Sequence, residues 1–76
     1  MKKERHELSI EIKGRTYTGY RIVEWTKTGD MYQLIYYRDH LSYKDIRKYK
    51  PGHEKTMESV AKLILEQLVS AAGEFK

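Results

Sequence analysis

Residues 54 to 72 carry the one long helical pattern of this 76-residue chain, and this pattern limits the folds open to it. The apolar residues recur at helical spacing, so the segment is expected to bury one stripe. That stripe comprises Met57, Val60, Ala61, Ile64, Leu68, Ala71 and Ala72. Gly73 follows, and glycine readily takes the left-handed conformation that ends a helix. A single helix can cover only one face of one sheet.

The residues before the helix predict β-structure. Apolar and polar residues alternate strictly from Glu7 to Lys13, which indicates a strand with one buried face. The next segments are rich in tyrosine, threonine and β-branched residues, which favour strands. The predicted strands comprise residues 7–13, 15–25 and 31–38. The sequence therefore predicts an α+β fold, β-β-β-α: a three-stranded antiparallel sheet with one long C-terminal helix packed on one face. Residues 1–6 are expected to form a flexible lead before a single domain, 7–76.

Residues 39–53 are open to three interpretations: a helical turn, a fourth edge strand or a loop. Ser42, followed three residues later by Asp45, resembles a helix N-cap. The residues Tyr43, Ile46 and Tyr49 are also spaced for a short helical turn. A strand through residues 43–48 is the competing interpretation.

The sequence leaves two ways to assign the faces of the second strand. A bulge at Gly19 would place Tyr17, Tyr20 and Ile22 on one face. Without a bulge, Tyr17 shares a face with Val23 and Trp25. The predicted buried set is Leu8, Ile10, Ile12, Tyr20, Ile22, Leu34, Tyr36, Val60, Ala61, Ile64 and Leu68. The opposite parity then occupies the uncovered face, with Arg21, Val23, Trp25, Met31, Ile35 and Tyr37.

Positive charge is concentrated in one short stretch of the chain. The net charge is +4, and six bases against three acids between Arg38 and Lys55 account for most of the excess. Such a patch favours anionic partners, nucleic acid first, although a solvated face that keeps the protein soluble is the alternative. The bases of interest are Lys44, Arg47, Lys48 and Lys50, which are interleaved with tyrosines.

Two functions fit an uncovered sheet face that bears rings and bases. Rings stack on nucleobases and bases contact phosphates, so the leading hypothesis is a small non-catalytic module that binds DNA or RNA. In this hypothesis, Arg21, Trp25 and Tyr37 contact bases or sugars, and the connector cations contact phosphates. The alternative is a homodimer or another protein-interaction module, because rings and arginines are also enriched at protein interfaces. Leu63, which lies outside the helical stripe, supports that alternative.

Several function classes lack the residues they need. The chain has no cysteine, which excludes disulfides and thiolate metal sites and is compatible with a reducing cytoplasm. The three histidines lack the close spacing of a metal site. There is no glycine-rich phosphate loop, nucleophile elbow or carboxylate pair, so neither catalysis nor a cofactor is expected. No apolar run approaches the roughly 20 residues that span a bilayer, and none follows the charged start as in a secretory signal.

Overall fold

The computed structural model describes residues 2–38 and 40–74, which form four strands and one helix. The elements are β1 (Lys3–Ile12), β2 (Arg15–Trp25), β3 (Met31–Tyr37), β4 (Leu41–Tyr49) and α1 (Glu54–Ala71). The α+β fold, the antiparallel sheet and the C-terminal helix are as predicted, but the sheet has four strands rather than three. β1 begins at Lys3, so residues 3–6 extend the first strand instead of preceding it.

The fourth strand settles the interpretation of residues 41–49. β4 is an edge strand that pairs with β3, so the fourth edge strand is the correct one of the three interpretations left open. The pairing is irregular, because Gln33 lies opposite Asp45 and Met31 lies opposite Tyr49. Three residues of β4 therefore lie against Tyr32 alone. This bulge places the buried side chains Asp45 and Tyr49 four residues apart, with three exposed residues between them, so the strand lacks strict alternation there.

The strands follow one another in chain order, β1-β2-β3-β4. Lys13 and Gly14 form a two-residue turn with φ of 52° and 77°, so both residues have the positive φ of a type I′ hairpin. Ile12 consequently pairs with Arg15, and Leu8 pairs with Gly19. Even-numbered residues of β1 therefore share a face with odd-numbered residues of β2.

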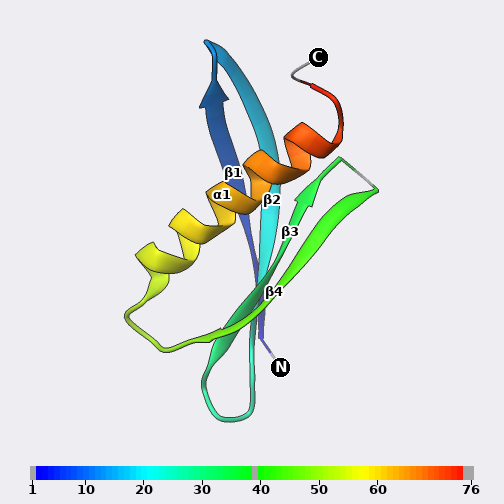
Figure 1. The fold of residues 1–76 in the computed structure, drawn as a ribbon. Helices are drawn as coiled ribbons and strands as arrows, with labels where there is room; N and C mark the ends of the chain where they lie inside the picture. Colours follow the sequence, from blue (N-terminus) through cyan, green and yellow to red (C-terminus); the bar gives the residue numbers. More distant parts are fainter. Residues whose placement is uncertain (1, 39, 75–76) are drawn as a thin grey trace.

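α1 crosses one face of the sheet obliquely, and the tip of the β1–β2 hairpin extends beyond it (Figure 1). The larger core cluster comprises Leu8, Ile35, Tyr37, Ala61, Leu65, Leu68 and Val69. The smaller cluster comprises Val23, Met31, Tyr49 and Met57. Gly19 lies where the helix comes closest to β2, since a Cβ there would be 2.8 Å from Leu65 Cδ1. After the helix, Gly73 has a φ of 79°, which confirms the predicted stop.

The predicted buried set is partly correct on β1 and α1, where it lacks the buried Met57, Leu65 and Val69, and wrong on the central strands. Leu8, Ala61 and Leu68 are buried, and Ile10 and Ile64 pack against the core. Ile12 and Val60 are half-buried. The errors are Tyr20, Ile22, Leu34 and Tyr36, which are half-buried on the face away from the helix. Their odd-numbered neighbours on β2 and β3 face α1, because the two-residue hairpin fixes that register.

Candidate nucleic-acid interface

Three residues predicted to contact bases lie on the face that α1 covers. Arg21 and Tyr37 are 8% and 6% exposed, and Tyr37 belongs to the larger core cluster. Trp25 is half-buried and packs against the smaller cluster. The prediction that these side chains occupy the uncovered face is therefore wrong, since the register of β1 and β2 turns them toward the helix.

Arg21 and Trp25 both line a small pocket of about 120 Å³ near the start of α1. The carboxylates of Glu4 and Glu54 line the same pocket, and they would repel phosphate. Burial lowers the pKa of Arg21, and the nearby charges of Glu58 and Glu4 oppose that shift. This pocket is consequently a poor place for a nucleic acid.

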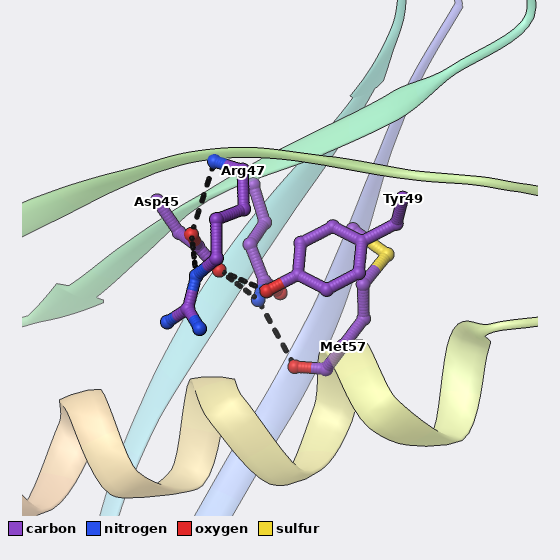
Figure 2. A network of polar contacts seen from close by, with 5 residues as sticks. Asp45, Arg47, Tyr49 and Met57 are labelled. Atoms are coloured by element: carbon purple, nitrogen blue, oxygen red, sulfur yellow. Dashed lines mark hydrogen bonds and ion pairs between the residues drawn. The ribbon is translucent and has the colours of Figure 1, made fainter.

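Asp45 lies at the centre of a buried polar network between α1 and the sheet (Figure 2). Its Oδ2 accepts hydrogen bonds from Tyr49 Oη at 2.6 Å and from Gln33 Nε2 at 3.0 Å. Its Oδ1 accepts from the backbone N–H of Arg47 at 3.3 Å and from Arg47 Nε at 3.2 Å. Burial alone would raise the pKa of Asp45, but these donors outweigh it and hold that pKa below its usual value.

The network joins four elements of the fold, β2, β3, β4 and α1. Gln33 Nε2 also donates to the carbonyl oxygen of Met57 at 3.0 Å, and its Oε1 accepts from Arg21 at 3.2 Å. Burial, followed by the bond to Asp45, raises the pKa of Tyr49 to about 12. Gln33 separates the two apolar clusters along β3, so the network secures the bulged strand rather than forming a reactive site.

The four predicted phosphate contacts, Lys44, Arg47, Lys48 and Lys50, are all exposed and lie on β4 or directly after it. Arg47 binds Asp45 through Nε, and its side chain remains 67% exposed. Lys50 Nζ lies 2.8 Å from Asp30 Oδ1, which lowers the pKa of Asp30, with a smaller contribution from Thr28. The edge strand thus brings the predicted cations together.

The face of the sheet away from α1, here called the uncovered face, carries a row of stacked side chains. The rings of Tyr20 and Tyr36 lie 4.8 Å apart and are inclined by 12°. The guanidinium of Arg5 lies over Tyr20, with Cζ 3.9 Å from the ring centroid. Arg5 also binds Glu7 at 3.1 Å. The row therefore crosses the sheet from β1 through β2 to β3.

A second group on the uncovered face connects it to the edge strand. Lys44 Nζ lies 5.2 Å from the ring centroid of Tyr32. A hydrogen bond between Tyr32 and Glu24 raises the pKa of the phenol and lowers that of the carboxylate. Glu24 also lies 3.3 Å from Lys3. Ile22 and Leu34 pair between these two groups. The acids Glu7 and Glu24 offset two of the cations on this face, so the excess of positive charge lies toward β4.

Arg5, Tyr20, Tyr32, Tyr36 and Ser42 are the residues of this surface that the sequence prediction missed. The signal that identifies them is the Lys13–Gly14 turn. A two-residue hairpin makes Ile12 face Arg15 across the turn, and counting back from that pair places Tyr20 opposite Glu7, on the polar face of β1.

Three large apolar side chains of β4 and α1 are also exposed. Tyr43 and Ile46 of β4 are 58% and 74% exposed, and Leu63 of α1 is 64% exposed. Tyr43 lines a shallow cavity of about 390 Å³ together with Arg47, Ile64, Gln67 and Leu68. Exposed apolar side chains of this kind have the chemistry of a protein contact.

Within residues 2–38 and 40–74, no group of three or more histidine and carboxylate side chains is placed to hold a metal ion. α1 is the one helix in the same part of the chain, and it is not long and apolar enough to cross a membrane. Comparisons with protein-family models, with curated proteins and with solved structures gave no match.

Proposed function

We propose that this protein is a non-catalytic nucleic-acid-binding module that uses β4 and the adjoining half of the uncovered face. Support comes from one contact above all: Lys44 Nζ, a cation of the edge strand, lies 5.2 Å from the ring of Tyr32 on the uncovered face. Groups suited to phosphates and groups suited to bases therefore adjoin each other.

The proposed path follows the edge strand. Lys44 and Lys48 supply exposed ammonium groups, and Arg47 keeps guanidinium nitrogens beyond the Nε that binds Asp45. Lys50 is the next cation after Lys48. Its ammonium group already binds Asp30, so a phosphate would share that group with the Asp30 carboxylate. Tyr36, Leu34 and Tyr32 form the adjoining surface for bases.

Binding should weaken steeply with salt, because each contacted phosphate releases counterions. Four contacts predict a slope of log affinity against log salt of about −2.8 to −3.6. The affinity should then fall roughly 50- to 150-fold between about 50 and 200 mM salt. The measurement is a fluorescence anisotropy titration of DNA and RNA oligonucleotides over that range. Absence of binding at the lowest salt would refute the proposal.

A charge-matched pair of variants tests the location. Lys44→Gln/Lys48→Gln should reduce the magnitude of the salt slope by about half, since two of four contacts are removed. The control, Lys55→Gln/Lys62→Gln, changes two exposed lysines of α1 and the same net charge. Equal losses in both variants would indicate a general charge effect and contradict a site on β4.

The exposed apolar side chains of β4 and α1 support a second candidate, a homodimer. Tyr43, Ile46 and Leu63 are more than half exposed, and desolvating such side chains favours association. Light scattering should then give a dimer mass that Leu63→Lys reduces to a monomer. A monomer at high protein concentration would dismiss this candidate.

A further inference from the structure

The two rings of the row Arg5–Tyr20–Tyr36 follow the spacing of the strands. The step from Tyr20 to Tyr36 is 4.8 Å, which matches the spacing of about 4.7–4.9 Å between neighbouring strands, and Arg5 lies closer to Tyr20, with Cζ 3.9 Å from the ring centroid. Each side chain of the row thus stands over its own strand: Arg5 on β1, Tyr20 on β2 and Tyr36 on β3. A fourth member at the same step would stand over β4.

Ser42 occupies that position on β4. It pairs directly with Tyr36 and is exposed. A serine side chain is too short to cover a phenol ring, and Tyr20 provides the recorded ring contact of Tyr36 among residues 2–38 and 40–74. The position beside the Tyr36 ring and over Ser42, here called the space, is therefore where a further ring of the stack would lie.

The space suits one flat aromatic group. A bound ring would extend the stack of Arg5, Tyr20 and Tyr36. Because Tyr20 already stacks on Tyr36, binding does not have to restrict the rotation of the Tyr36 side chain. β4 is an edge strand, which leaves the space open from the side. Lys44 lies two residues further along the same face of β4 and can meet a phosphate attached to that group.

We propose that an unpaired base of single-stranded nucleic acid stacks on Tyr36 above Ser42, with Lys44 at its phosphate. The inference rests on the proposed function and adds to it the strandedness of the ligand and the position of one base. Bases inside a duplex are covered on both sides by their neighbours, so only an unpaired base can enter. DNA and RNA share this chemistry, and oligothymidylate and oligouridylate distinguish them.

Two substitutions remove the stacking position in opposite ways. Tyr36→Leu removes the ring, and Ser42→Tyr fills the space with a side chain of the protein's own. Each should weaken binding of oligothymidylate or oligouridylate roughly 5- to 150-fold, the loss typical of one base–aromatic stack. Tyr36→Phe keeps the ring and should bind as the unchanged protein does. Ser42→Tyr should keep the fold, because aromatic cross-strand pairs stabilise sheets.

Tyr43→Leu is the matched control, since it removes an exposed tyrosine of β4 from the other face. Circular dichroism checks that each variant is folded. Nuclear Overhauser contacts between base protons and the Tyr36 ring protons are the direct readout, which a merely structural role of Tyr36 would not produce.

The outcomes separate this inference from the broader proposal. Salt-dependent binding that Tyr36→Leu and Ser42→Tyr leave unchanged, or tighter binding of a duplex, would overturn the inference and leave the proposed function standing. No binding of any oligonucleotide at low salt would remove both. A dimer that Ser42→Tyr dissociates would show that the space receives a ring from a second copy, which also overturns the inference.

Discussion

Gln33 and Asp45 face each other across β3 and β4, and the amide of Gln33 donates to both the Asp45 carboxylate and the carbonyl oxygen of Met57 on α1. Both distances are 3.0 Å, and Gln33 is fully buried. One side chain thereby connects the central strand, the bulged edge strand and the helix.

Replacing Gln33 by Leu should destabilise the protein markedly. The substitution removes one donor from the buried Asp45 carboxylate and leaves one donor of Arg21 without its acceptor, and each buried polar group so deprived costs about 1–3 kcal/mol. Urea denaturation measures the change in the free energy of unfolding. Gln67→Leu, the same change at an exposed position of α1, should have little effect. Similar values for the two variants would contradict the role assigned to the network.

Asp45→Asn should destabilise the protein at neutral pH by about 1–3 kcal/mol, since a buried charged acceptor is lost. The penalty should shrink in acid. The pKa of Asp45 is lower in the folded than in the unfolded state, so its contribution is complete above the unfolded value of about 4 and is lost as pH falls through the folded value. Unfolding free energies of both proteins between about pH 2 and 7 test this window. A penalty independent of pH would contradict it.

Tyr49→Phe should remove part of the alkaline instability. The folded pKa of about 12 lies above the ordinary 10, so Tyr49 stabilises fully below pH 10 and loses that contribution as pH rises through 12. The unchanged protein should therefore lose stability between these values faster than the variant. Thermal melts at increasing pH measure the difference, and absorbance of tyrosinate should show one fewer late-titrating phenol in the variant. Parallel curves would count against a buried, protonated Tyr49.

Gly19→Ala should strain the contact between helix and sheet. A Cβ at this position would lie 2.4 Å from the carbonyl oxygen of Tyr36 and 2.8 Å from Leu65 Cδ1. Overpacking of this kind costs about 1–3 kcal/mol. Adding Leu65→Ala should not restore stability, because the closer contact is with backbone. Restoration by the double substitution would show that the side chain, rather than the carbonyl, sets the limit.

The sequence predicted the fold class well because its strongest signals are local. Helical spacing and Gly73 identified α1, and alternation identified the inward residues of β1 such as Leu8. The faces of β2 and β3 were assigned wrongly because both faces carry large side chains. Only the two-residue turn after Ile12 distinguishes them.

The candidate surface was predicted in part for a related reason. The four predicted phosphate contacts lie within residues 44–50, so charge counting found them, and all four are exposed on β4 or directly after it. The stacked row was missed because Arg5, Tyr20 and Tyr36 meet only through strand pairing. The strand nature of residues 41–49 was left open because Tyr43, Ile46 and Tyr49 are spaced for a helical turn, and the bulge that disrupts strict alternation there is not visible in the sequence.

The shared carboxylate beneath the edge strand ties the evolution of several positions together. In a related protein without the acid at position 45, the buried amide of Gln33 and the phenol of Tyr49 would both lack their acceptor. Viable lineages should therefore exchange these three residues as a set, for instance all for hydrocarbon side chains, while the neighbouring lysines drift independently.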